Sequence, residues 1–575
     1  MAVISDETPY IPRLSFIEDP DANTLVEGTR NLTSVLSLLA IIAMLASTIL
    51  VVTVINNVIT EQKGQIGVMK SIGASTTDNF FIYSGMAFAY GIIGTIVGVI
   101  LALPAASAMA TAIAPLSGTY IDGFKISVTG IIIGVVLGLL FPVIAALIPV
   151  LIGTRVSILK AMTDLGISSK WGSGPVSRAV GHLPVPISIR QAISNIMQKV
   201  GRLVLTVITL TIAIGAFMGV TALFSFFDDA IADIFDTFDT DIQMTTQEIE
   251  DFDATSQLIM DNIDGVKQIA PGYAVTVALQ DYEAPEDNSF AAGTNQVEVA
   301  GIDTTTDTIH FSYSSGTGWD EDPDRQGIVL NETVSENIGK VAGDMVNVTI
   351  AGQTYEYEVI GVNTWPFDTV FLDWRELATI AGFTDEDGNP APGTFNIDLE
   401  GSPDAVEVSR VINQIKDLAA ENDIQAVYAN QAQNEEDISE LIGSFGLIFN
   451  MASIVMAAVG AVGLLAVLSM AVLERQKEIG VMRSLGAGST TIIVQFLVEG
   501  LLVGILAWII GLPLSYGISL LLNSALGADA FFDFSYPPRV ALQGLIGVIV
   551  LAAIASIWPS VTAARKTVSD ILRYQ

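Results

Sequence analysis

The chain has 575 residues, of which 51% are hydrophobic and only 15% charged, and its mean hydropathy is +0.56. Soluble domains of this length do not have such a composition, so the sequence predicts a membrane protein. The absence of cysteine excludes disulfides and thiol catalysis, and two histidines are too few for a multi-histidine metal centre. No GxxxxGK[ST] sequence occurs, so the chain does not bind ATP through a P-loop of its own.

Seven apolar runs approach or exceed the roughly 20 residues needed to cross a bilayer. They lie at about 34–59, 79–103, 126–152, 200–227, 444–473, 490–524 and 540–562. The run at 490–524 is longer than one helix needs and contains Gly511 and Pro513, so we expect it to tilt, break or end early.

Positive charge predicts the orientation of these spans. Of the 25 Lys and Arg residues, 15 fall in four short stretches: Lys63 and Lys70; Arg155 through Arg202; Arg475, Lys477 and Arg483; and Arg565, Lys566 and Arg573. The positive-inside rule places these stretches in the cytoplasm of a cell whose plasma membrane holds the protein. We therefore expect the N-terminus and the segment 228–440 outside and the C-terminus inside. The acidic N-terminus has no apolar region typical of a cleavable signal.

Two short charged connectors repeat one another. EQKGQIGVMKSIGA at 61–74 and ERQKEIGVMRSLGA at 474–487 are related by an ungapped offset of 413 residues, which also places Gly91 and Gly98 on Gly504 and Gly511. Each connector lies between apolar runs, so the sequence predicts a duplicated membrane module. The intramembrane glycines predict close helix packing.

The segment 228–440 has 45 acidic and 6 basic residues. Such a surface is typical of a halophilic protein, or it provides a field that attracts cations or basic peptides. Strand-like runs with turns at 327–364 and a helical stretch at 404–422 predict an α+β domain. Asn331 and Asn347 begin sequons and are possible glycosylation sites.

These patterns together resemble the FtsX-like permease family, the membrane subunits of MacB- and LolC/LolE-type ABC machines. The resemblance rests on the connector ERQKEIGVMRSLGA, on FLVEGLLVGILAWIIG after it, and on the closing sequence PSVTAARKTVSDILRYQ. GDMVNVTIAGQTYEYEVIGV and VFLDWRELATIAGF resemble the MacB-like periplasmic core domain. Long members of the family carry two full units, and relative to them the first unit here lacks one span and most of a domain.

The resemblance implies a fold class and a division into domains. We expect an α-helical polytopic membrane protein of about seven spans and two FtsX-like repeats, with an α+β extracytoplasmic domain. The expected domains are an N-terminal extracytoplasmic remnant (1–33), a first FtsX-like permease domain of three spans (34–160), a cytoplasmic linker with an amphipathic helix at 186–200 (161–199), a transmembrane helix (200–227), a MacB-like core domain (228–440) and a second FtsX-like permease domain of three spans (441–575).

The resemblance also implies that the connectors are coupling helices that dock on a cytoplasmic ABC ATPase dimer. The residues expected to couple are Glu61, Lys63, Gly67, Lys70 and Gly73 in the first copy, and Glu474, Arg475, Glu478, Gly480, Met482, Arg483 and Gly486 in the second. Ile479, Met482 and Leu485 are expected on one helix face. The alternative is a pair of amphipathic helices lying on lipid.

Glu499 is the one acidic residue deep in a span, where it would make a structural hydrogen bond or serve a proton or cargo role.

The implied function is that of a permease subunit that couples ATP hydrolysis by a separate ATPase to motion of the extracytoplasmic domain, for export or extraction of a lipid, lipoprotein or peptide. The chain itself is then not an enzyme and needs no cofactor. The other classes considered are a membrane-anchored surface scaffold or binding protein and an FtsX-like regulator of a cell-surface enzyme. The expected partners are the ATPase, the lipid bilayer and a second permease copy or paralogue, and no nucleic acid.

Overall fold

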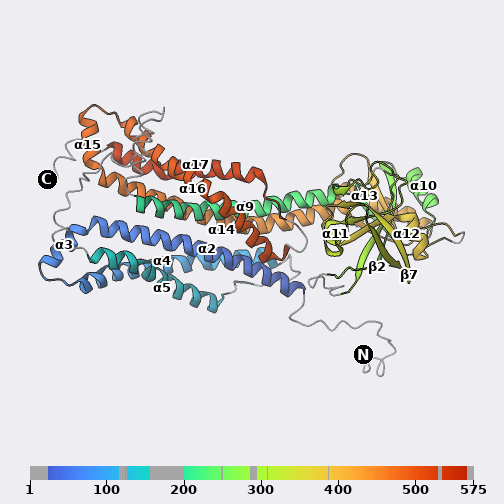
Figure 1. Cartoon of the computed structure of the whole chain (residues 1–575), viewed down its shortest axis with the longest axis horizontal. Coiled ribbons are helices and arrows are strands. Elements are labelled where there is room, and N and C mark those ends of the chain that lie inside the picture. The colour runs from blue at the N-terminus through green and yellow to red at the C-terminus, as the bar shows by residue number, and fades with distance from the viewer. Residues whose placement is uncertain are drawn as a thin grey trace, which may run out of the picture. The chain divides into compact units, whose positions relative to one another are not determined.

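The computed structural model describes residues 24–114, 123–124, 126–155, 200–247, 250–284, 294–306, 308–385, 388–528 and 534–565. These residues form two compact units, which are described separately (Figure 1). The helical unit comprises the described residues up to Phe226, Ser444–Ala528 and those from Phe534 onward, and the α/β unit comprises the described part of Phe227–Gly443. The predicted linker helix at 186–199 lies outside the described residues.

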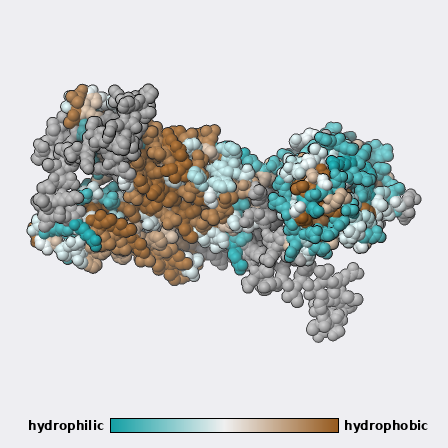
Figure 2. Space-filling model, viewed as in Figure 1, coloured by the Kyte–Doolittle hydropathy of each residue, from teal (hydrophilic) through white to brown (hydrophobic). Residues whose placement is uncertain are grey.

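Seven helices of the described residues are long and apolar enough to cross a membrane, which confirms the seven predicted spans. They are α2 (Thr24–Glu61), α4 (Thr76–Ile113), α5 (Val128–Thr154), α9 (Val200–Asp236), α14 (Gln431–Glu474), α16 (Ser489–Leu526) and α17 (Pro538–Arg565). Two short helices, α3 (Lys63–Ser71) and α15 (Gln476–Ser484), connect α2 to α4 and α14 to α16. Apolar side chains dominate the visible surface of the long helices (Figure 2).

Helix α16 excludes two of the three outcomes predicted for the run at 490–524. It is continuous over 38 residues with Pro513 inside it, so it neither breaks nor ends early. A break within lipid would leave backbone N–H and C=O groups without partners, whereas an enclosed proline disturbs the hydrogen bonds of a single turn.

The α/β unit is built on one mixed sheet of ten strands, as predicted for an α+β domain. The strand order is β10-β1-β9-β2-β3-β8-β5-β7-β4, and β6 pairs with β2 and β7. The strands are β1 (Ile242–Thr246), β2 (Val266–Leu279), β3 (Gln296–Ile302), β4 (Tyr313–Gly316), β5 (Ile328–Asn331), β6 (Met345–Ile350), β7 (Gln353–Asn363), β8 (Thr369–Asp373), β9 (Thr394–Leu399) and β10 (Ala426–Asn430). The helices are α10 (Phe252–Asn262), α11 (Glu332–Ile338), α12 (Trp374–Ala381) and α13 (Ala405–Glu421).

The long strand β2 serves two hydrophobic cores in this unit. Its first half pairs with β9, where apolar residues of β1, β9, α10 and α13 pack together. Its second half pairs with β3, and a larger core there includes residues of β5 to β8 and α12. One continuous sheet therefore joins both cores.

Asn331, one of the two possible glycosylation sites, is enclosed by the fold. This side chain is buried, accepts a hydrogen bond from the Val334 N–H at 3.0 Å as the N-cap of α11, and donates to the Trp365 carbonyl at 3.3 Å. A glycan on Asn331 would require this side chain to leave its capping position, so we expect the site to stay unmodified. Asn347 lies on β6 and donates to Gln280 at 2.7 Å, and its modification stays a prediction.

Candidate functional site: the two connectors

Each connector helix is anchored by one buried isoleucine. In the first repeat, which comprises α2 to α5, Ile66 packs among residues of α2, α4 and α5. In the second repeat, which comprises α9 and α14 to α17, the matching Ile479 packs among residues of α14, α16 and α17. Gly67 and Gly480, which follow these isoleucines, are also buried. Both connectors are therefore fixed at the junction of three spans.

A polar contact joins the start of each connector to the span that follows it. In the second repeat Arg475 Nη1 lies 3.0 Å from Glu499 Oε2, and the two side chains are only 11% and 7% exposed. The matching position of Arg475 is Gln62, whose Oε1 accepts a hydrogen bond of 2.9 Å from the Tyr83 hydroxyl. An ion pair in one repeat thus takes the place of a neutral hydrogen bond in the other.

This ion pair revises what the sequence suggested for its two members. Arg475 was expected to dock on the ATPase, but its guanidinium points inward to Glu499. For Glu499 the contact corresponds to the structural alternative, a bond between helices. A carboxylate and a guanidinium this far from water stabilise each other only as a pair.

A second polar contact ties the end of each connector to the last span of its repeat. Lys70 Nζ donates to the carbonyl of Thr154, the last residue of α5. The matching Arg483 donates to the carbonyl of Ala564, near the end of α17. The free carbonyls at a helix C-terminus carry partial negative charge, so a cation is favoured there. Each connector is therefore held at both ends.

Gly73 and Gly486 end the two connectors with φ angles of +107° and +96°. Residues with a side chain rarely adopt this conformation, which explains a glycine at both positions. The remaining predicted coupling residues lie as follows: Glu61 and Glu478 are exposed, and Lys63, Glu474 and Met482 are half-buried.

The outward face of each connector carries a matched apolar pair that the sequence reading missed. Val481 and Leu485 are exposed in the second repeat, and Val68 and Ile72 are exposed at the same positions of the first. Leu485 is 83% exposed and so does not share the packed face of Ile479, contrary to expectation. The signal was present in the sequence as apolar residues four positions apart in both copies.

Among the described residues, no group of three or more His, Asp or Glu side chains is placed to hold a metal ion. The exposed apolar pairs of the connectors offer a surface for another macromolecule or for lipid.

Comparison with known families agrees with this architecture. The family model described as FtsX-like permease C-terminal matches residues 37–158 and 450–568, one match for each repeat. The MacB-like periplasmic core domain matches residues 203–418. The chain belongs to the FtsX-like permease family. As an FtsX-like permease it is a multi-pass membrane protein.

Individual relatives are distant. The ABC transporter permease YtrF of Bacillus subtilis is 26% identical over 42% of this chain and 57% of its own length. The uncharacterized ABC transporter permease YknZ of the same organism is 22% identical over 54% of this chain and 77% of its own length. The macrolide export ATP-binding/permease protein MacB of Neisseria meningitidis is 22% identical over 39% of this chain and 34% of its own length. The chain thus spans about half or less of YtrF and MacB.

Proposed function

We propose that this FtsX-like permease is the membrane subunit of an ABC complex. In that complex a separate cytoplasmic ATPase displaces both connectors as it hydrolyses ATP. The observation that carries the proposal is the matched construction of the connectors. Each is fixed by a buried isoleucine and by polar contacts at both ends, and each presents an exposed apolar pair.

The placement of the connectors supports a partner with two equal binding sites. Asn31, near the start of α2, donates to the carbonyl of Leu526, the last residue of α16, at 3.1 Å. The start of α2 and the end of α16 therefore share one end of the helical unit, and the connectors lie at the opposite end (Figure 1). Two similar surfaces at one end suit the two subunits of an ATPase dimer. The positive-inside rule supports a cytoplasmic location for that end and for the C-terminus, with the N-terminus and the α/β unit outside.

Helix α14 joins connector α15 to the α/β unit and so provides a path for this displacement. It is unbroken from Gln431 to Glu474, and its 44 residues correspond to about 66 Å at 1.5 Å per residue. Its first residues belong to the α/β unit and its last residue adjoins α15. A displacement of α15 would reach the α/β unit along one helix, which fits mechanical transmission to an extracytoplasmic domain. Export or extraction of a lipid, lipoprotein or peptide is the activity we propose for that motion.

Charge substitutions on the exposed pairs test the docking surface. We expect Val481→Asp with Leu485→Asp, and separately Val68→Asp with Ile72→Asp, to lower stimulation of the partner ATPase by about tenfold or more, since a docked apolar pair contributes at least 1 to 2 kcal/mol. The control is Val406→Asp, which introduces the same charge at an exposed valine of the α/β unit. ATP hydrolysis of the complex in nanodiscs is the measurement. Unchanged hydrolysis in both double variants would favour a scaffold instead.

The lipid alternative has its own test. If the connectors lie on the bilayer, a Leu485→Trp variant in nanodiscs containing brominated phospholipid will lose much of the added indole fluorescence. If they dock on the ATPase, addition of the ATPase will change that fluorescence and bromine will not. Strong bromine quenching that persists with the ATPase bound would contradict the proposal.

A further inference from the structure

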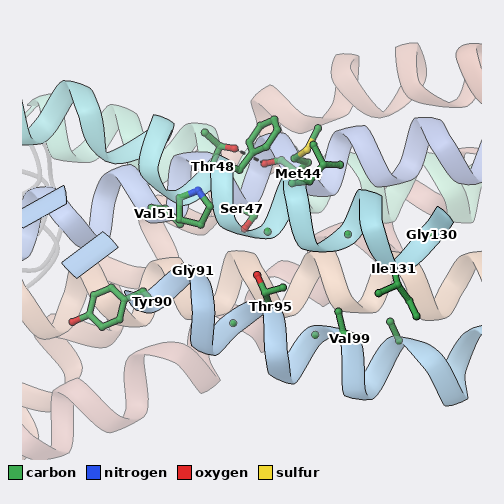
Figure 3. Close-up of a pocket in the computed structure, with 18 of the residues that line it drawn as sticks. Met44, Ser47, Thr48, Val51, Tyr90, Gly91, Thr95, Val99, Gly130 and Ile131 are labelled. Atoms are coloured by element: carbon green, nitrogen blue, oxygen red, sulfur yellow. Dashed lines mark hydrogen bonds between the residues drawn. The ribbon is translucent and has the colours of Figure 1, made fainter. Parts of the chain in front are cut away.

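The first repeat contains a large cavity along its spans. Its volume is about 1230 Å³, and it is lined by α2, α4, α5 and the two residues before α5 (Figure 3). The lining is apolar and rich in small residues, including Ser47 on α2, Gly94 and Gly98 on α4, and Gly134 on α5. A Cβ added at any of these three glycines would meet no atom within 4 Å. The stripe of glycines on α4 is therefore only partly a packing surface, unlike the prediction.

In the second repeat the corresponding surface is covered by α9. The Gly511 Cβ position is 3.7 Å from the Gly215 backbone nitrogen, and the Gly544 Cβ position would collide with Met218. Ser519 donates to the Gly219 carbonyl at 3.0 Å. A third helix, α14, approaches α9 at Gly460, whose Cβ position is 2.8 Å from the Ala213 Cβ. Helix α9 thus contacts all three other spans of its repeat.

The residues under α9 and the residues lining the cavity are the same positions of the repeat. The offset of 413 relates Gly460, Gly511 and Ser519 to Ser47, Gly98 and Ala106. An offset of 410, which relates Pro149 to Pro559, places Gly544 on Gly134. All four first-repeat positions line the cavity.

An independent contact supports both offsets. The Gly91 Cβ position faces Gly138 and Pro142, and the Gly504 Cβ position faces the matching Val548 and Ala552. The packing of α4 on α5 is therefore equivalent to that of α16 on α17. The described first repeat has this packing without a helix in the place of α9, and the cavity occupies that place.

Described helices of this chain do not fill that place, since α9 itself is engaged in the second repeat. Residues 1–23 and 156–199 contain no apolar run of about 20 residues that could span a membrane. An α9 from a second copy would have to leave its own repeat and abandon its contacts there.

We propose that the cavity is the binding site for a transmembrane helix that lies outside residues 1–575 and has the character of α9. That helix is apolar along its length and carries glycine or alanine where it crosses α4, as α9 carries Gly215 opposite Gly511. Once bound, it gives the first repeat four spans around one connector, as in the second repeat. The proposal depends on the helix packing of the two repeats and holds whether or not the connectors dock on an ATPase.

A cross-linking experiment with a defined probe tests the site and its register. The probe is a synthetic peptide with the sequence of Val200–Asp236 and Gly215→Cys, added to the full chain in phosphatidylcholine/phosphatidylglycerol nanodiscs. Because the chain has no cysteine, Gly98→Cys provides its single thiol. We expect a disulfide between the peptide and position 98, at least tenfold more abundant than with either of two control variants.

The controls separate specific seating from random collision. Ile100→Cys lies on the opposite, exposed face of α4. Gly511→Cys is the matched position of the second repeat, which the resident α9 covers. Gly134→Leu, added to Gly98→Cys, should abolish the disulfide by filling the cavity, and size-exclusion chromatography checks that this variant stays folded.

Equal cross-linking at positions 98, 100 and 511 would overturn the proposal, because it would mean that the peptide has no preferred binding position. Failure of the peptide to cross-link at position 98, together with quenching of a fluorophore there by brominated lipid, would also overturn it and would assign the cavity to acyl chains.

Discussion

Connector α3 is joined to its following span by the hydrogen bond between Gln62 and Tyr83, whereas connector α15 is joined by the ion pair of Arg475 and Glu499. The contacts differ in chemistry but link the same two helices, with Glu499 about one helical turn beyond Phe496, the match of Tyr83. What the repeats preserve is therefore a polar contact between these helices, and the residues that make it can change. The repeats differ more at the surface covered by α9, which in the first repeat lines an open cavity.

The largest expected effect comes from removing one member of the ion pair. Glu499→Met introduces the residue that the first repeat has at this position, and it leaves Arg475 buried without its carboxylate. We expect the free energy of unfolding to fall by about 3 to 5 kcal/mol. The triple variant Arg475→Gln, Phe496→Tyr and Glu499→Met recreates the pair of Gln62 and Tyr83, and it should recover most of that loss. Reversible unfolding in mixed micelles measures both changes.

The converse result would be informative. If the triple variant is no more stable than Glu499→Met alone, the two contacts are not interchangeable, and the similarity of the repeats at this level would be a coincidence of sequence.

A smaller effect is expected from adding bulk at matched glycines. Gly511→Leu forces a side chain against the backbone of α9 and should cost about 1 to 3 kcal/mol. Gly98→Leu extends into the open cavity and should change stability by no more than about 0.5 kcal/mol. The same unfolding measurement compares the two variants. A large loss at Gly98 would show that the first repeat is closed there and that the contrast between repeats is false.

The smallest effect concerns the N-termini of the spans after the connectors. Ser75 and Asp78 form a capping box at the start of α4, whereas Gly488 at the start of α16 offers no side-chain cap. Ser75→Ala should lower the free energy of unfolding by about 0.5 to 1 kcal/mol, and Gly488→Ser should raise it by about a few tenths of a kcal/mol. Hydrogen exchange in the first turn of each helix is the readout. Faster exchange in α16 after Gly488→Ser would contradict this explanation.

The sequence predicted the spans and the α+β character of the second unit because both depend on patterns along the chain. Apolar runs of sufficient length cross a bilayer whatever their neighbours are. The rule that a proline ends or breaks a helix failed at Pro513, because the need to satisfy backbone groups in lipid outweighs the usual effect of proline. At Asn331 the sequence is compatible with both a sequon and a helix N-cap, and only the structure shows the N-cap.

The contacts of the candidate site could be predicted only in part. The repeat identified the connectors, and Gly73 and Gly486 were correctly singled out as matched positions, although their φ angles came from the structure. The partner of Arg475 could not be read from the sequence, since Glu499 lies 24 residues away on another helix. Charge on a short amphipathic helix suggests exposure, yet this guanidinium points inward. The cavity in the first repeat could not be predicted either, because matched glycines occur in both copies and only the structure shows which of them are covered by α9.

The ion pair of the second repeat has a consequence for how the two copies can change over generations. A short exchange of sequence from the first copy into the second that replaced Glu499 by methionine but kept Arg475 would bury an uncompensated charge. Only an exchange long enough to carry positions 475 to 499 together avoids that intermediate. We therefore expect Arg475 and Glu499 to be exchanged together or not at all, which would slow the convergence of the two copies.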